Sequence, residues 1–421
     1  MPRPTTLAPL PSSTRASRLN QLRPGGLSRG AAFVAIAAIL VLFLAASAAP
    51  SPLYVVYQAD WGFSAITLTG IFAIYVFGLL GSLLVFGALS DHIGRRRVLG
   101  AAIALETVAL VLFLVAGDVG VVAGARFLQG IATGAAMTTL SAALIDLTPE
   151  HAPGRAGVVN SVAPLAGLAT GALACGALVQ FGPSPTHLVY AILLAGMLLA
   201  AIAVLLAPET SARRPGARSS LRPRVALPAR LRADFLAITP VLLASWAVGG
   251  LYLSLGPSVA AGEFGLSNHL IGGLVVTLLC GTGAIAAFGL QGRPPQHLLL
   301  TAGTLLTVGM LITLAAIDTG PAWLAAAGTV VAGVGFGAAA LGAFGTLARI
   351  ALPNERGELF AVALVLSYLA FSVPALAAGL ASTRYGLHPT VLVYGAVVVA
   401  LSVSALGAQR ILARRPPAVA G

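Results

Sequence analysis

The chain has 421 residues, of which 58% are hydrophobic and only 9% are charged, and this composition excludes a soluble multidomain protein. The formal net charge is +12, and every one of the 24 basic residues is arginine. Because these arginines lie between long apolar segments, we expect anionic lipid headgroups to be their partners, and not nucleic acid. Both cysteines lie inside apolar segments, so the sequence indicates no disulfide framework and no metal site.

The chain begins with a basic tail, residues 1–30, which contains five arginines and no acidic residue. Apolar segments of about 20 residues or more then follow one another to the C-terminus, and each is long enough to cross a bilayer as a helix. Their number and length predict an all-α membrane protein. The twelve segments are approximately 31–57, 65–90, 97–117, 119–147, 157–181, 187–208, 235–260, 267–291, 296–317, 321–350, 357–382 and 388–411.

Arginine is distributed very unequally over the alternate loops. The two tails and the loops on one side hold 22 of the 24 arginines, whereas the other side holds only Arg384 and one arginine, Arg126, lies inside a segment. Positively charged loops stay on the cytoplasmic side of a membrane. We therefore predict a multi-pass protein of the cytoplasmic (inner) membrane with both termini in the cytoplasm.

Residues 209–234 interrupt the apolar pattern with seven arginines and several prolines. This composition predicts a basic cytoplasmic linker between two six-helix halves, residues 31–208 and 235–411, with a short tail at 412–421. The halves also resemble each other at an offset of 203 residues, at which 59–64 (Ala-Asp-Trp-Gly-Phe-Ser) meets 262–267 (Gly-Glu-Phe-Gly-Leu-Ser). Such a repeat favours two pseudo-symmetric bundles.

The connection after the second segment has the pattern Gly87-x3-Asp91-x2-Gly94-Arg95-Arg96. It resembles the signature between the second and third spans of major facilitator superfamily transporters. That resemblance implies twelve helices in two six-helix bundles and a role in conformational switching. We place Asp91 at the C-terminal end of a helix, where the dipole disfavours a negative charge, and expect an arginine one turn later as its partner. The alternative is a basic loop that serves only topology.

A second match lies in the fourth segment, where Arg126-x-x-Gln129-Gly130 resembles the fourth-span signature of the same superfamily. The resemblance implies a role in proton-coupled transport. Gln129 shares the helical face of Arg126, and Gly130 and Gly134 offer a surface for close helix packing. An arginine that only cross-links helices is the alternative.

Glu106, near the middle of the third segment, is the other acidic or basic residue well inside a span, and it is a candidate for proton coupling with Arg126. The alternative is a Glu106 that stays neutral, because burial disfavours a charged carboxylate.

Proline and glycine mark further candidates for a cavity or a hinge. Pro50 and Pro52, followed by Tyr54, lie late in the first segment, where prolines free backbone groups and kink a helix. Gly167-x3-Gly171 partly resembles an antiporter signature of the fifth span, but Ala172 stands where a proline is expected. The cavity and hinge candidates are Pro50, Pro52, Tyr54, Gly130, Gly134 and Gly171.

The function predicted from these features is secondary transport of a small organic solute by alternating access. A largely uncharged cavity favours proton-coupled efflux of drug-like or amphiphilic compounds; proton-coupled uptake of a sugar or an organic acid is the alternative, and a membrane sensor or scaffold a remote one. We expect a monomer that is not an enzyme. We also expect no cofactor and a proton gradient as the energy source, since no nucleotide-binding loop and no ligand-spaced histidines are present.

Overall fold

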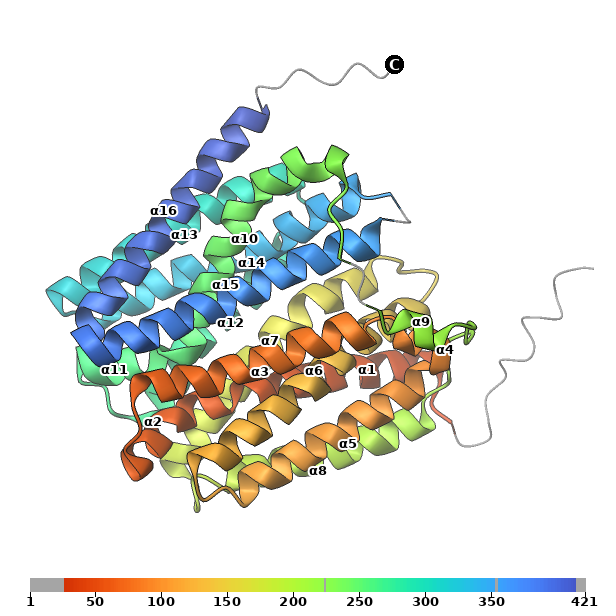
Figure 1. The fold of residues 1–421 in the computed structure, drawn as a ribbon, viewed down its shortest axis with the longest axis horizontal. Coiled ribbons are helices and arrows are strands. Elements are labelled where there is room, and N and C mark those ends of the chain that lie inside the picture. The colour runs from red at the N-terminus through yellow and green to blue at the C-terminus, as the bar shows by residue number, and fades with distance from the viewer. Residues whose placement is uncertain (1–25, 223–224, 353–354, 414–421) are drawn as a thin grey trace, which may run out of the picture.

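The computed structural model describes residues 26–222, 225–352 and 355–413 (Figure 1). Most of both predicted tails, residues 1–25 and 414–421, and two residues of the linker, 223–224, lie outside these ranges. Within the described ranges the secondary structure is helical, and twelve helical spans are long and apolar enough to cross a membrane. The prediction of an all-α protein with twelve spans is therefore confirmed.

The first half contains six spans, of which the first is divided into two helices. The elements are α1 (Arg29–Ala48), α2 (Pro50–Trp61), α3 (Ala65–Phe86), the short α4 (Leu89–Ile93), α5 (Arg95–Leu114), α6 (Val119–Leu147), α7 (Arg155–Phe181) and α8 (Leu188–Leu206).

The short helices α9 (Ala217–Ser220) and η2 (Ala229–Leu231) connect the first half to the second. The second half contains α10 (Arg232–Ser254), α11 (Gly256–Phe264), α12 (His269–Gly289), α13 (Pro295–Thr319), α14 (Ala322–Ile350), α15 (Arg356–Tyr385) and α16 (Leu387–Ala413).

The two halves lie side by side, and equivalent helices make equivalent contacts (Figure 1). In the first half α6 packs against α3 and α5, and in the second half α14 packs against α12 and α13. The outer faces are also related, because α5 packs against α8 as α13 packs against α16. The halves meet mainly through two pairs, α7 with α12 and α3 with α15.

Glycines of the repeat produce the same close contact in each half. A Cβ placed on Gly134 of α6 would lie 2.4 Å from the carbonyl oxygen of Leu79 in α3. Its counterpart at the offset of 203 is Gly337 of α14, where a Cβ would lie 2.2 Å from the carbonyl oxygen of Gly283 in α12. Small residues at these positions let the helix backbones touch, which is how helices associate in lipid, where no hydrophobic driving force acts between them.

Contacts between the halves follow the same symmetry. A Cβ on Gly176 of α7 would lie 2.8 Å from the carbonyl oxygen of His269 in α12. The repeat-related Gly379 of α15 faces α3, where a Cβ would lie 2.9 Å from the carbonyl oxygen of Ala65. The backbones of the two halves are therefore packed closely at the ends of α7 and α15.

Candidate functional site

A chain of buried polar groups joins α1, α5 and α6 in the interior of the first half. Arg126 and Gln129 lie one turn apart on α6, and an Arg126 guanidinium nitrogen donates to Gln129 Oε1 at 2.5 Å. Gln129 Nε2 donates to Glu106 Oε1 of α5 at 2.9 Å. Gln129 lies on the face of Arg126, as predicted, and it bridges the cation and the carboxyl group, which the sequence did not indicate. All three side chains are at least 99% buried.

Two backbone carbonyls at the junction of α1 and α2 complete this polar network. Pro50 has no N–H and cannot donate to the carbonyl of Ala46, four residues earlier. Gln129 Nε2 donates to that carbonyl oxygen at 3.1 Å, and Arg126 donates to the next one, Ser47 O, at 3.0 Å. Pro50, predicted to free backbone groups, therefore leaves the Ala46 carbonyl oxygen available to Gln129, and the neighbouring Ser47 carbonyl oxygen accepts from Arg126.

The charge on Arg126 is stabilised without a direct ion pair. Its guanidinium carbon lies 4.2 Å from the centroid of the Tyr75 ring and 6.0 Å from that of the Tyr54 ring, distances at which a cation is attracted to an aromatic face. No carboxylate oxygen of the described residues lies within 4.0 Å of Arg126. Three buried polar groups of this network have no hydrogen-bond partner among the described residues: Arg126 Nε, Glu106 Oε2 and the Tyr54 hydroxyl.

The glycine candidates lie at helix contacts. A Cβ on Gly130 would lie 2.1 Å from the carbonyl oxygen of Tyr75, and one on Gly171 of α7 would lie 2.2 Å from that of Ala45 in α1. Gly134 makes the equivalent contact with α3 described above. These residues hold α1, α3, α6 and α7 together around Arg126, while their predicted part in a hinge stays a prediction.

The second candidate cluster lies at the end of the bundle that carries Arg95–Arg97, which we call the arginine-rich end. Asp91 pairs with Arg95 at 2.5 Å, and Arg95 also contacts Asp146, at the end of α6, at 3.2 Å. Of the two arginines in the motif, Arg95 forms the ion pair with Asp91. Arg96 instead donates to the carbonyl oxygens of Val204 and Leu205 on α8.

The expectation that Asp91 ends a helix is wrong. The second span stops at Phe86, with Gly87 as its C-cap, and Asp91 lies in the first turn of the separate helix α4. The dipole of α3 therefore does not oppose its charge. Gly94, which separates α4 from α5, has φ +109°, a conformation that favours glycine. The chain turns here because Gly94 permits a backbone geometry that other residues avoid.

Glu209, from the start of the linker, was not found by sequence reasoning. The first N–H groups of α5 need acceptors, but the N-cap residue Gly94 has no side chain to provide one. Glu209 supplies both oxygens, accepting from Arg95 N at 2.9 Å and from Arg96 N at 3.4 Å. The sequence feature that could have pointed to it is that Glu209 is the only acidic residue between positions 209 and 233.

The rest of this linker segment is bound to the same loop. Ser211 Oγ donates to the Asp91 carbonyl oxygen at 3.0 Å, and Arg214 N donates to the same atom at 3.1 Å. Thr210 Oγ1 donates to Asp146 Oδ2 at 2.9 Å. The linker thus begins as a structured segment that is fixed on the first half.

A cavity of about 600 Å³ lies at the arginine-rich end between the two halves. The first half contributes Asp91 and His92 to its lining, the linker contributes Ser219 and Arg222, and α15 of the second half contributes Glu358. Charged side chains of both halves therefore face a common space at this end. At the opposite end of α7 and α15 the backbones are in contact, as described above.

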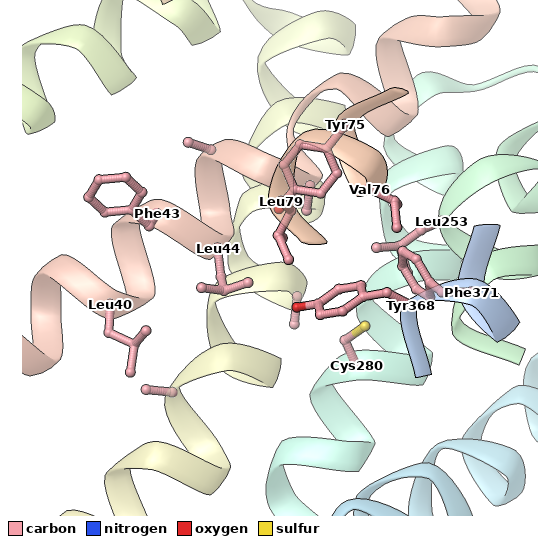
Figure 2. Packing of buried hydrophobic residues seen from close by; sticks show 14 of the residues in the cluster. Leu40, Phe43, Leu44, Tyr75, Val76, Leu79, Leu253, Cys280, Tyr368 and Phe371 are labelled. Carbon is pink, nitrogen blue, oxygen red and sulfur yellow. The ribbon is translucent and has the colours of Figure 1, made fainter. Parts of the chain in front are cut away.

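Aromatic side chains fill the centre between the halves. The ring centroids of Trp246 and Tyr368 lie 4.8 Å apart, and Phe371 lies 5.0 Å from Phe72 of the first half. The Tyr368 hydroxyl reaches Met137 Sδ of the first half at 4.0 Å. Figure 2 shows Tyr368 extending from α15 toward Leu44 and Leu79, with Cys280 beside it. Among the described residues Glu106 and Arg126 are the only fully buried charged side chains.

Residues 32–374, most of the chain, match the family model of the Major Facilitator Superfamily. The chain belongs to this superfamily. A comparison with curated protein sequences finds no match.

Solved structures of the superfamily share the fold at low sequence identity. A bacterial homologue of the human lysosomal transporter Spinster, in an inward-facing and unoccupied conformation, is 14% identical with a TM-score of 0.69, over 93% of this chain and 99% of that chain. A D-xylose–proton symporter is 17% identical with a TM-score of 0.69, over 89% and 96%. The xylose transporter XylE from E. coli, in an inward open conformation, is 16% identical with a TM-score of 0.70, over 91% and 100%. These likenesses concern the fold alone.

Proposed function

We propose that this superfamily member is a secondary active transporter that moves a small organic solute by alternating access between its halves. The observation that carries the proposal is the difference between the two ends of the boundary. One end has the cavity of about 600 Å³, whereas the other is closed by backbone contacts at Gly176 and Gly379. Access from one side at a time requires this asymmetry, and rocking of one bundle against the other reverses it.

The arginine-rich end faces the cytoplasm in this proposal, because positive loops are retained there. Ser219 lies at that end and Ser267 at the other, and both are exposed. With Cys175 and Cys280 replaced by alanine, a membrane-impermeant maleimide applied to intact cells is expected to label Ser267→Cys and not Ser219→Cys. The reverse pattern would overturn the orientation.

Proton coupling is assigned to Glu106, with Gln129 and Arg126 as the groups that respond to it. A carboxyl group can exchange a proton, whereas arginine stays charged. Gln129 contacts both Glu106 and Arg126, and both residues of α6 contact the carbonyls at the α1–α2 junction. A change of charge on Glu106 therefore reaches the point where the first span is divided. The Asp91–Arg95–Asp146 cluster is proposed to stabilise one of the two access states.

The proposed substrate class rests on the aromatic side chains at the centre between the halves. Trp246, Tyr368 and Phe371 offer aromatic faces, which attract apolar molecules and organic cations. Efflux of amphiphilic aromatic compounds is therefore the first choice. Uptake of a sugar is the second, and the xylose–proton symporter of the same fold is the reason to include it in the test.

The test is flux into proteoliposomes with an imposed pH gradient of either direction, measured for ethidium and for radiolabelled xylose. Glu106→Gln keeps an oxygen for Gln129 but removes the exchangeable proton. It is expected to lower pH-driven flux at least tenfold while gradient-free exchange of the solute persists. Arg126→Ala should abolish pH-driven flux per molecule, Arg126→Lys should keep part of it, and Thr329→Ala, at the repeat-related position, should keep it.

Two outcomes would contradict these proposals. Undiminished pH-driven flux per molecule in Glu106→Gln or in Arg126→Ala would refute the coupling role. Pumping of xylose and not of ethidium would replace efflux of amphiphiles by sugar transport.

A further inference from the structure

The three arginines at the start of α5 differ in how they are bound. Arg95 is held by Asp91, Asp146 and Ser90, and Arg96 by two carbonyl oxygens of α8. Arg97 is exposed, and its side chain makes no hydrogen bond or ion pair with any residue that the structure describes. Arg97 is therefore the member of the triplet whose charge is available to a partner.

Arg97 stands beside an apolar groove of about 270 Å³ on the surface of the first half. Arg97, Ala101 and Leu105 follow one another at intervals of four residues along one face of α5 and line this groove. Phe86 from the end of α3 and Ile131 from α6 are among the residues of the other walls. Alanines at 101, 102, 132 and 135 leave the space open, and α5 lies at the outer edge of the first half in Figure 1.

The repeat shows that the scaffold does not require a cation at this position. At the offset of 203, Arg97 corresponds to Leu300 of α13, which is 38% exposed. An apolar residue suits a helix face that meets lipid, whereas an arginine there is costly unless it reaches the headgroups or an anion. The presence of Arg97 next to an apolar groove thus indicates a ligand with a negative head and a hydrocarbon tail.

We propose that this groove binds one anionic phospholipid, with its phosphate on Arg97 and an acyl chain along Ala101 and Leu105. The volume agrees with such an occupant, because a cavity of about 150 Å³ holds a benzene molecule and one of this size holds a segment of a chain. Among the residues that the structure describes, Arg97 is the only charged one in the lining. The site therefore selects for the charge of the lipid and not for the chemical detail of its headgroup.

The test is native mass spectrometry of the full chain in detergent, titrated with phosphatidylglycerol or with phosphatidylcholine that carries the same acyl chains. A basic residue near the membrane surface contributes about 1 kcal/mol toward an anionic lipid, which corresponds to about fivefold in affinity. Arg97→Gln is expected to lower phosphatidylglycerol binding by about this factor and to leave phosphatidylcholine unchanged. Ala101→Phe, which fills the groove from its exposed side, should lower the binding of both lipids.

Arg293→Gln is the matched control, because Arg293 is an exposed arginine in the corresponding loop between α12 and α13. It should leave the first bound phosphatidylglycerol in place. Equal losses in Arg97→Gln and Arg293→Gln would overturn the proposal in favour of general surface attraction. Competition by soluble glycerol 3-phosphate would also overturn it, because the acyl chain would then contribute nothing. If Ala101→Phe lowers the unfolding temperature, Arg97→Glu tests the same contact without changing the groove.

Discussion

Gln129 connects the two ionisable groups buried in the first half, Arg126 and Glu106, and its removal is expected to destabilise that half. Its amide makes two hydrogen bonds to ionisable partners, Arg126 and Glu106, and one to the Ala46 carbonyl. A hydrogen bond to a charged group contributes about 1.5–3 kcal/mol and a neutral one about 0.5–1.5 kcal/mol. Gln129→Leu keeps much of the side-chain volume but loses all three bonds. Because the bond to Glu106 counts as a neutral one while that carboxyl group holds its proton, we expect a decrease in the free energy of unfolding of about 2.5–7.5 kcal/mol.

The assay is reversible unfolding of the purified protein in mixed micelles by increasing fractions of sodium dodecyl sulfate. Thr133→Val is the control on the same helix, one turn later, because the buried Thr133 hydroxyl makes a neutral bond to the carbonyl oxygen of Gln129. Thr133→Val should lower the free energy of unfolding by about 1 kcal/mol. If Gln129→Leu costs no more than Thr133→Val, the amide does not hold the cation and the carboxyl group together, and the argument for a coupled network fails.

Two other predictions concern the packing of the first half. Gly134→Ala should lower the free energy of unfolding by about 1–3 kcal/mol in the same assay, because its Cβ would lie 2.4 Å from the Leu79 carbonyl oxygen. Gly100→Ala, which has open space around it, should have little effect. Equal effects would show that the close contact of α6 with α3 does not depend on a glycine at position 134. Glu209→Gln removes the charge that accepts from the first N–H groups of α5, and a loss of about 0.5–2 kcal/mol is expected. Glu358→Gln, in the first turn of α15, is its control. A loss of equal size there would mean that any acidic residue at the start of a helix stabilises it, without the specific contacts of Glu209.

The sequence by itself determined the number of spans and the repeat. A helix that crosses lipid must be apolar over its whole length whatever its neighbours are, so the twelve spans were visible as runs of hydrophobic residues. The Asp91–Arg95 pair was also predictable, because the two residues are only four positions apart in the sequence, although Gly94 breaks the helix between them. The close-packing glycines of α6, Gly130 and Gly134, were predictable because a spacing of four residues places both on one face of the helix.

Only the tertiary structure decided which side chains meet between helices. Arg126 is held by Gln129, two carbonyl oxygens and the Tyr75 ring, while Glu106 reaches it only through Gln129. Glu209 caps the N-terminus of α5, although it lies 114 residues from Arg95 in the sequence. Such contacts depend on the depth and the rotation of each helix. In helices that are apolar on all sides, the pattern of residues does not say which face is turned inward, and only the packing of the neighbouring helices fixes it.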